Sequence, residues 1–344
     1  MKPFSLFSAA LFTFTSLFSC VAVTAQRDSK EIARPANYKP MELQLSPELQ
    51  TILARSVEET LSSLPSGGFK TDEIAATLID LRNPSEARWA NVAGEKKLYP
   101  ASVVKLFFMA ALQQQLEDRK VVLTKELERG QRDMIVDSSN EATQYILDVL
   151  TETSSGAEMP QKRFDAWQHK RNRVNRFFAS MGYTNINVNQ KTFCEDAYGI
   201  EQQSRAYKGQ NRNMQTTNAT ARLMAEIALK RFVNAARSEN MMELMRRDPF
   251  KTTKDLDDQA TGFIGKSILD NNWTGTKLWS KAGWTSRSRH DAAYIETPDG
   301  LKFVLVIFTE NHANEREPIP LVAARIISAM RGESQQARPF STSQ

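Results

Sequence analysis

The chain has 344 residues, which is enough for one large domain or two ordinary ones. Its hydrophobic content of 41% and charged content of 25% are typical of a soluble globular protein. The formal net charge is +5, but lysine and arginine are spread among acidic residues with no basic run that contains aromatic residues, so nucleic acid is not expected as a partner.

The N-terminus has the pattern of a secretory signal. Lys2 is followed by an apolar run over residues 4–23 and then by small residues. This pattern predicts a signal peptide over residues 1–25 and export to the periplasm or the extracellular space. A membrane anchor is the alternative, but the serine and threonine residues within the run argue against a permanent transmembrane span. A lipoprotein signal with Cys20 as the lipidated residue is a second alternative.

The first predicted helix follows a polar linker at residues 26–45. Ser46, Pro47 and Glu48 are typical of a helix start, because the serine caps a free N–H group and the proline lacks one. We expect this helix to end at the Pro-Ser-Gly-Gly sequence of residues 65–68.

The rest of the chain predicts a helical block between two groups of strands. Residues 101–268 are mainly helical, residues 318–330 form a final helix, and the polar tail at 333–344 is expected to be disordered. A Pro-Asp-Gly turn at 298–300 joins the last two strands as a hairpin. The predicted strands lie at residues 74–80, 87–95, 278–282, 291–297 and 301–309.

This order predicts an α/β (α+β) fold for a single domain at residues 46–332. Strands from both ends of the chain would form a largely antiparallel, five-stranded sheet with the terminal helices on one face. An all-helical subdomain, about residues 101–268, would be inserted between them. We expect a functional site where a sheet edge meets this insert.

Cysteine and histidine residues are few. If the leader is removed, Cys194 is the remaining thiol, so no internal disulfide is possible. We interpret Cys194 as a structural buried thiol, with a nucleophilic thiol as the alternative. His169, His290 and His312 lack the spacing of metal ligands, so no metal and no cofactor are expected.

Ser102 and Lys105 form an S-x-x-K motif at the start of a very apolar predicted helix. Residues three apart share one helix face, so the lysine lies beside the serine hydroxyl. A buried amine with a lowered pKa can accept the proton of a serine nucleophile. The alternative is that Ser102 only caps the helix and that Lys105 is solvated.

Two further short motifs follow along the chain. The first is Ser138-Ser139-Asn140, whose outer residues could shuttle a proton and bind a substrate amide, although an N-cap cluster is the simpler alternative. The second is Lys281-Ala282-Gly283, on a strand edge that an extended substrate could approach.

In this order the three motifs resemble those of penicillin-binding proteins and class A β-lactamases. The segments Tyr99–Ser102, Arg212–Thr217 and Lys281–Phe308 are also similar to that family, and the resemblance covers about residues 46–332. It implies a β-lactamase-like fold with Ser102 as the acylated nucleophile.

The resemblance also implies roles for the other motif residues. Lys105 would accept the serine proton, and Ser138 would deliver a proton to the departing nitrogen. Asn140 would bind the acyl-side amide, and Lys281 would steady Ser138 and attract the substrate carboxylate.

Four more residues are substrate-binding candidates. Gly283 belongs to the third motif, and the backbone N–H of Trp284 would join that of Ser102 in an oxyanion hole. Arg287 or Arg289 would pair with the substrate carboxylate, with surface arginines as the alternative.

The sequence departs from the family pattern in three ways. Ser139 replaces aspartate, Ala282 replaces threonine, and the E-x-x-L-N sequence that holds the water-activating glutamate is absent. Glu201, or failing that Glu195, lies in the right region to be the deacylating base.

The leading hypothesis is a β-lactamase-like serine hydrolase that opens a β-lactam amide through an acyl-serine. The first alternative is a D-Ala-D-Ala carboxypeptidase acting on peptidoglycan stem peptides, and a serine-dependent glutaminase is more distant. A non-catalytic binding or sensor module of the cell envelope is the non-enzyme alternative. We expect a monomer with a small-molecule β-lactam or a peptidoglycan stem peptide as its ligand.

Overall fold

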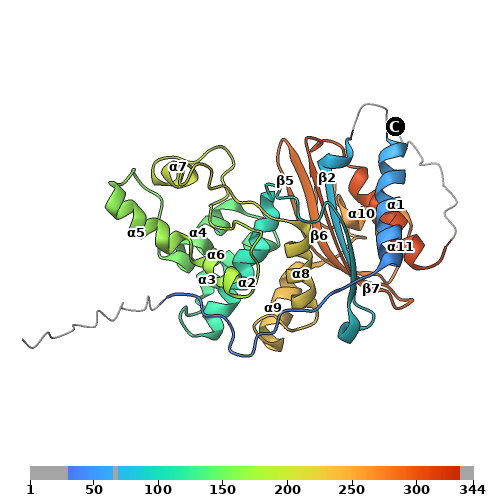
Figure 1. Ribbon diagram of the computed structural model, residues 1–344, viewed down its shortest axis with the longest axis horizontal. Helices are drawn as coiled ribbons and strands as arrows, with labels where there is room; N and C mark the ends of the chain where they lie inside the picture. Colours follow the sequence, from blue (N-terminus) through green and yellow to red (C-terminus); the bar gives the residue numbers. More distant parts are fainter. Residues whose placement is uncertain (1–29, 65–68, 334–344) are drawn as a thin grey trace, which may run out of the picture.

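The computed structural model describes residues 30–64 and 69–333 (Figure 1). The signal peptide predicted over residues 1–25 and the alternative of lipidation at Cys20 lie outside the described residues. So does the tail predicted at 333–344, apart from its first residue.

In the described part of the chain, seven strands form one sheet in the order β1-β3-β2-β7-β6-β5-β4. Neighbouring strands are antiparallel except for β1 and β3, which are parallel. The strands are β1 (Gln44–Leu45), β2 (Ile74–Asp80), β3 (Arg88–Val92), β4 (Arg246–Arg247), β5 (Lys277–Trp284), β6 (Ser288–Glu296) and β7 (Lys302–Glu310).

The mixed α/β class and the antiparallel sheet are confirmed, but the predicted count of five strands is wrong. The additional strands, β1 and β4, are the two edges of the sheet, and each has two residues. Two residues are too few to show the alternation of polar and apolar side chains that identifies a strand in a sequence.

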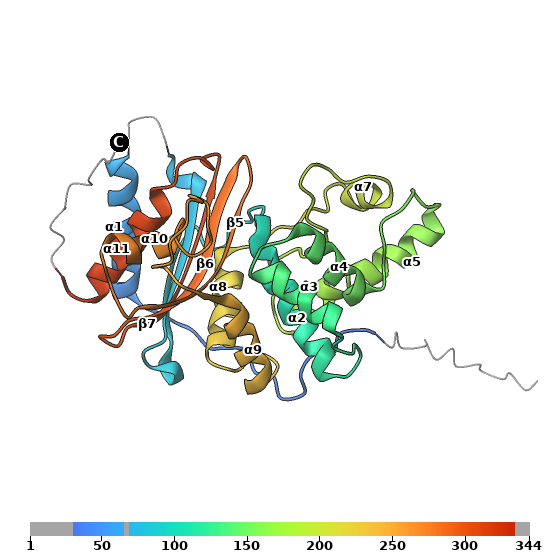
Figure 2. The same cartoon turned by 180° about the vertical axis from the view of Figure 1, so that it is seen from behind.

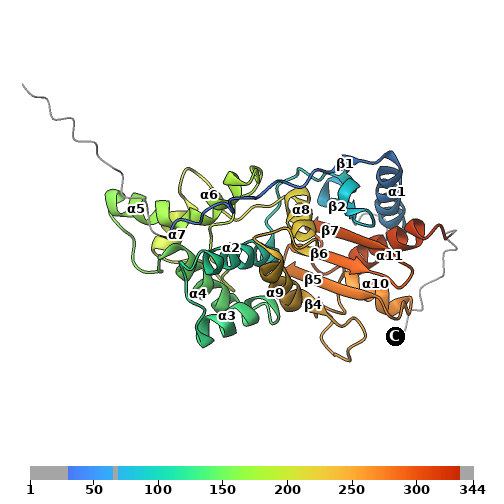
Figure 3. The same ribbon diagram turned by 90° about the horizontal axis from the view of Figure 1, so that it is seen from below.

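Helices cover both faces of the sheet. The terminal helices α1 (Pro47–Ser63) and α11 (Pro318–Met330) pack on one face with α10 (Ile264–Asp270), and α8 (Thr217–Ala228) packs on the other (Figure 3). The five longer strands alternate between two hydrophobic cores, because successive side chains point to opposite faces. In β2, Ile74, Ala76 and Leu78 face the terminal helices, whereas Ala75 and Ile79 belong to the core on the opposite face.

The helical subdomain lies beside the sheet, and α2 runs through its centre (Figure 2). Every residue of α2 from Lys105 to Leu116 is buried, which explains why its sequence lacks a polar face. The helices of this subdomain are α2 (Lys105–Glu117), α3 (Lys125–Ile135), α4 (Asn140–Thr151), α5 (Gln161–Arg171), α6 (Arg173–Ser180) and α7 (Ile200–Arg205). After them come the sheet-packed α8 and then α9 (Ala235–Met245), which contacts α8, α2 and β5.

Residues 30–45, within the predicted linker, pack along the helical subdomain (Figure 3). Ile32, Tyr38 and Met41 are buried in the same core as α2. The Tyr38 hydroxyl donates hydrogen bonds of 2.8 Å to the buried carboxylate of Glu226 in α8. This stretch is therefore an integral part of the domain and not a free linker.

Among the described residues, none of the helices combines the length and the apolar character needed to cross a membrane.

Candidate active site

Ser102 lies where the sheet meets the helical subdomain. It belongs to a short 3₁₀ turn, Ala101–Val104, that leads directly into α2. Ala101 has a left-handed backbone with φ of 47°, a conformation that residues other than glycine rarely adopt. Such strain costs about 1–3 kcal/mol and concentrates at functional sites. The turn leaves the Ser102 side chain partly accessible, although its neighbours Ala101 and Val103 are buried.

Gly283 of β5 allows this turn to pack directly on the sheet. A Cβ atom at Gly283 would lie 2.6 Å from the backbone nitrogen of Ser102 and 2.9 Å from that of Val103. No side chain can be accommodated at such distances. The glycine thus brings the N–H group of Ser102 beside the strand that continues into Trp284.

The Lys105 amine contacts both serines of the first two motifs. Its Nζ atom lies 2.9 Å from Oγ of Ser102 and 3.2 Å from Oγ of Ser138. It also donates hydrogen bonds to the Ser138 carbonyl and, at 2.9 Å, to Oδ1 of Asn140. Because Lys105 has no exposed surface, the alternative of a solvated lysine is wrong.

The second motif is both a helix cap and part of this cluster. The hydroxyl of Ser139 accepts a hydrogen bond of 3.0 Å from the Ala142 N–H group and so caps α4. Ser138 has a left-handed backbone with φ of 57°, and its side chain meets the two lysines. Thus the N-cap interpretation and the interpretation of Ser138 and Asn140 as neighbours of Lys105 are compatible.

Lys281 approaches Ser138 from the opposite side. Its Nζ atom donates hydrogen bonds of 2.9 Å to Oγ of Ser138, 2.5 Å to Oε1 of Gln259 and 2.7 Å to its neighbouring carbonyl at Ala282. Gln259 in turn donates a 2.9 Å hydrogen bond to the carbonyl of Val136, just before the second motif. Sequence reasoning missed Gln259, which lies in an irregular loop without a recognisable motif.

Burial shifts the pKa values of both lysines downward. It lowers the pKa of Lys105 to about 7, against smaller opposing electrostatic effects of Glu141 and Cys194. The pKa of Lys281 is held well below its usual value, first by burial and then by repulsion from Lys105. A substantial fraction of Lys105 is therefore neutral at neutral pH and able to accept a proton.

His290 fixes the approach to Ser102 from the sheet side. Its Nδ1 accepts a 3.1 Å hydrogen bond from the Thr309 N–H group, so its Nε2 carries the proton and donates a 2.8 Å bond to the carbonyl of Tyr99. Burial lowers the pKa of His290 to about 4, which keeps it neutral. Sequence reasoning tested this histidine only as a metal ligand and missed this role.

Cys194 is exposed, so the prediction of a buried structural thiol is wrong. Its sulfur lies 3.4 Å from Nδ2 of Asn140, at the N-terminus of α4. The loop that carries it crosses in front of this helix, and the Thr192 carbonyl accepts a bond of 3.1 Å from Gln144. A single cysteine in a polar loop has no sequence feature that reveals such a position.

The two glutamates proposed as deacylating bases lie in different environments. Glu201 is buried, and its carboxylate accepts two hydrogen bonds of 2.7 and 2.8 Å from Arg171 and one of 2.9 Å from Ser155. Burial alone raises the pKa of the Glu201 carboxyl, but Arg171, together with Lys191 and Ser155, outweighs this effect and holds the pKa below its usual value. Glu195 is exposed and directly follows Cys194.

This ion-pair group lies well away from Ser102. Arg171 and Lys191 also pair with Asp148, at 3.5 and 2.6 Å. Asp148 is eight residues beyond Asn140 in α4, about 12 Å along the helix axis. None of the described hydrogen bonds or ion pairs connects Glu201 to Ser102 or Lys105.

The other substrate-binding candidates surround the end of β5. Trp284 is 40% exposed, and its ring lies 5.9 Å from that of Phe263. Arg287 is exposed and donates a hydrogen bond of 3.0 Å to Asn311. Arg289, by contrast, is buried.

The Arg289 guanidinium already has partners within the protein. It donates hydrogen bonds of 2.7 Å to Asp257 and to the carbonyl of Gly262, and it stacks over Phe263. Of the two arginines, the structure leaves Arg287 accessible from solvent.

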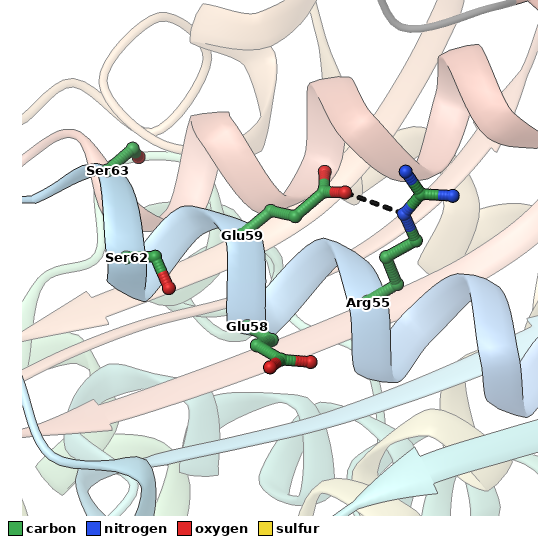
Figure 4. Close-up of a pocket in the computed structure, with 5 residues that line it drawn as sticks. All are labelled: Arg55, Glu58, Glu59, Ser62 and Ser63. Atoms are coloured by element: carbon green, nitrogen blue, oxygen red, sulfur yellow. Dashed lines mark hydrogen bonds and ion pairs between the residues drawn. The ribbon is translucent and has the colours of Figure 1, made fainter.

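Other surface features offer less chemistry. Figure 4 shows a hollow along α1 whose Arg55 and Glu59 form an ion pair of 2.6 Å, as residues four apart on a helix commonly do. No group of three or more histidine, cysteine, aspartate or glutamate side chains in the described residues is arranged to hold a metal ion. The cluster around Ser102 is therefore the strongest candidate for chemistry: it combines an accessible hydroxyl, a buried amine and a second hydroxyl between two amines.

Comparison with known proteins agrees with this description. Among solved structures, a β-lactamase from Sphaerobacter thermophilus has a TM-score of 0.58 and 17% identity, covering 83% of this chain and 99% of that one. The protein PBP-A has a TM-score of 0.57 and 17% identity, covering 86% and 99%. A variant of PBP-A, solved as an acyl-enzyme complex with penicillin G, has a TM-score of 0.56, with the same identity and coverage. At identities this low, the structural likeness shows a shared fold and no more.

Sequence comparison gives the family directly. A comparison with curated proteins finds no match. A family model described as the β-lactamase enzyme family matches residues 57–329, which is most of the chain and contains all three motifs. The chain therefore belongs to the β-lactamase enzyme family.

Proposed function

We propose that this protein is a serine acyl-transfer hydrolase that opens the amide of a β-lactam through an acyl-Ser102 intermediate. The observation that carries the proposal is the position of the buried Lys105 amine, 2.9 Å from the Ser102 hydroxyl and 3.2 Å from that of Ser138. With a pKa of about 7, this amine can take the nucleophile's proton at neutral pH.

The contacts support a complete proton path. As Oγ of Ser102 attacks the β-lactam carbonyl, its proton passes to Nζ of Lys105. The C–N bond then breaks, and the departing nitrogen takes a proton from Oγ of Ser138. The protonated Lys105 amine in turn gives its proton to Oγ of Ser138. Lys281, 2.9 Å from the same hydroxyl, steadies Ser138 during the transfer. Water later hydrolyses the acyl ester.

Substrate contacts are proposed for the surrounding groups. The N–H groups of Ser102 and Trp284 would stabilise the oxyanion, an interaction typically worth about 2.7–4 kcal/mol per donor. Asn140 would bind the acyl-side amide. Arg287 would attract the carboxylate, and the hydrogen-bonding Lys281 amine would help to orient it, while Arg289 is committed to Asp257.

Penicillin labelling tests the nucleophile. We expect the mass of the wild-type protein to rise by the mass of one penicillin molecule, or a chromogenic cephalosporin to be hydrolysed. Neither reaction should occur with Ser102→Ala. The reaction should persist with a chelator present. Labelling of Ser102→Ala would refute the assignment. If the wild-type protein is not labelled and consumes no cephalosporin, the result would favour a non-catalytic binding module.

A second candidate is a slowly deacylating peptidase that acts on the D-Ala-D-Ala end of peptidoglycan stems. The observation that favours it is the pairing of Glu201 with Arg171, which removes one of the two candidate bases. The remaining candidate is Glu195, beside Cys194 on the loop that faces Asn140. A positioned base typically contributes about 10²–10⁴-fold to the rate.

The lifetime of the acyl-enzyme separates the two candidates. A lifetime of seconds or less that Glu195→Gln lengthens at least 100-fold would identify Glu195 as the base of a β-lactamase. A wild-type lifetime of hours, unchanged in Glu195→Gln, would favour the peptidase. In the second case a peptide ending in D-Ala-D-Ala should be cleaved, with release of D-alanine.

We also propose that the protein is exported and works as a monomer. Cleavage of the signal predicted over residues 1–25 would make Gln26 the first residue. Intact mass of protein recovered from outside the cytoplasm would check this. A lipid-modified chain beginning at Cys20 would contradict it.

A further inference from the structure

A polar cavity of about 540 Å³ lies in the helical subdomain, apart from Ser102. One wall is a face of α5 with the cap residue that follows it, formed by residues at positions i, i+3, i+4 and i+7: Asp165, Gln168, His169 and the cap residue Asn172. The opposite wall comes from residues 187–189 and from the turn at 207–211. Helix α5 lies at the end of the subdomain that is farthest from the sheet (Figures 1 and 2).

Asparagine side chains in the walls form a hydrogen-bond network in which the donor and acceptor ends of each amide are fixed. Nδ2 of Asn211 donates to the carbonyl of Ser204 at 3.0 Å, so its Oδ1 must be the acceptor for Nδ2 of Asn189 at 3.1 Å. Asn189 then donates to Oδ1 of Asn172 at 2.9 Å. Since the network starts at a backbone carbonyl, which cannot donate, the orientation of each amide follows from it.

Asn172 receives a second donor with an equally fixed orientation. The Oδ1 of Asn175 accepts from the Val188 N–H group at 2.7 Å, so its Nδ2 donates to Oδ1 of Asn172 at 2.7 Å. Because its oxygen accepts both of these hydrogen bonds, Asn172 turns its NH₂ group outward. This group has no partner among the described residues.

Gln168 ends the network in the same way. Nε2 of Gln190 donates to the Ser204 hydroxyl at 2.9 Å, and that hydroxyl donates to Oε1 of Gln168 at 2.7 Å. Gln168 is 3% exposed, yet its Nε2 has no partner within the described part of the chain. Two unpartnered NH₂ groups, one on the last turn of α5 and one on its C-cap residue four positions later, therefore face the cavity.

The charges around the cavity do not select an ion. Asp165 and Lys208 lie at its exposed rim with opposite signs. The Arg176 guanidinium is held by Glu31 at 2.6 and 2.7 Å. The lining is thus rich in fixed amide donors and nearly neutral, a combination that suits a ligand with several uncharged acceptor oxygens.

We propose that this cavity is a saccharide-binding site that recognises an N-acetylated amino sugar. An acetamido carbonyl is the strongest uncharged acceptor that a sugar carries, and it would bond to the free NH₂ groups of Gln168 and Asn172. The volume suits one or two sugar rings. The site requires no chemistry at Ser102 and adds a second ligand to the function proposed above.

Titration with di-N-acetylchitobiose, followed by saturation-transfer NMR and calorimetry, tests the proposal. We expect saturable binding that is at least threefold tighter than binding of cellobiose, which lacks the acetamido group. Gln168→Glu replaces the free donor by an acceptor of the same shape and should weaken binding about tenfold or more. The matched control Gln202→Glu, on the exposed face of α7, should stay within twofold of wild type.

Asn172→Asp makes the same exchange at the second donor and keeps the test decisive if the buried Gln168 variant folds poorly. Absence of saturable binding, equal binding of cellobiose, or full binding by both variants would overturn the proposal. Penicillin labelling of Ser102 should be unchanged in Gln168→Glu, and Ser102→Ala should still bind the disaccharide. Failure at either site is therefore distinguishable from failure at the other.

Discussion

Lys105 has no exposed surface, and the low polarity around it disfavours its charged form. Its four acceptors, two hydroxyls, a carbonyl and an amide oxygen, are all uncharged, so none of them restores the pKa by direct ion pairing. Gly283 and the strained backbone of Ala101 place the Ser102 hydroxyl against this amine. At this scale the chemistry depends on burial and on close backbone packing.

The pH dependence of acylation follows from the pKa of Lys105, which is about 7. Only the neutral amine accepts a proton, so the rate constant for penicillin acylation should fall about tenfold per pH unit below 7 and level off above it. Mass spectrometry of quenched samples between pH 5 and 9 would measure the profile, with circular dichroism as the control for folding. A flat profile, or a rate constant that still rises about tenfold per pH unit up to pH 9, would contradict this role for Lys105.

At the scale of elements, α5 and α7 contact each other through a small apolar cluster, and buried charges connect them to α4. Phe164, Trp167 and Ile200 form a small separate cluster between α5 and α7. Beside it, Arg171 and Glu201 pair while almost fully buried, and Asp148 of α4 joins them. A buried charge that loses its partner is strongly destabilising, so this group holds the elements in one arrangement.

Glu201→Gln should therefore act on stability. It leaves the buried Arg171 without its bidentate partner, and we expect the free energy of unfolding to fall by about 3–5 kcal/mol. Glu195→Gln, at an exposed position, should change it by less than about 0.5 kcal/mol. Urea unfolding of both variants would measure the difference. A fully stable Glu201→Gln with a greatly prolonged acyl-enzyme would instead identify Glu201 as the deacylating base.

At the scale of the whole molecule, the chain crosses between its two parts several times. Residues 30–45 run along the helical subdomain to the sheet, and residues 211–217 return from it to α8. The buried carboxylate of Glu226 in α8 accepts hydrogen bonds from Tyr38, Tyr183 and Arg222. Lys281 of β5 and Ser138, two residues before α4, meet where the two parts adjoin.

Tyr38→Phe tests this connection. The loss of the hydroxyl removes hydrogen bonds to the charged carboxylate of Glu226, and bonds to charged groups are worth about 1.5–3 kcal/mol. We expect a loss of that size in the free energy of unfolding, measured by urea denaturation. Tyr198→Phe, at an exposed tyrosine, is the matched control and should be neutral. Equal stability of both variants would show that the N-terminal stretch contributes little.

The main elements and the three motifs of the candidate site could be predicted from the sequence. Ser46 and Pro47 start α1 as predicted, and the turn at 298–300 joins β6 to β7. Capping, alternation and turn formation depend on neighbours within a few residues, so they can be read locally. The S-x-x-K spacing is equally local, because one helical turn brings its serine and lysine together.

Only the tertiary structure decided which distant side chains share an environment. Glu201 and Glu195 are six residues apart, yet one is buried against Arg171 and the other is exposed beside Cys194. Gln259 and His290 reach the site from loops and strands far along the chain. The path of an irregular loop depends on long-range packing and not on its own pattern, which is why these partners, and the fate of both glutamates, became visible only in the folded protein.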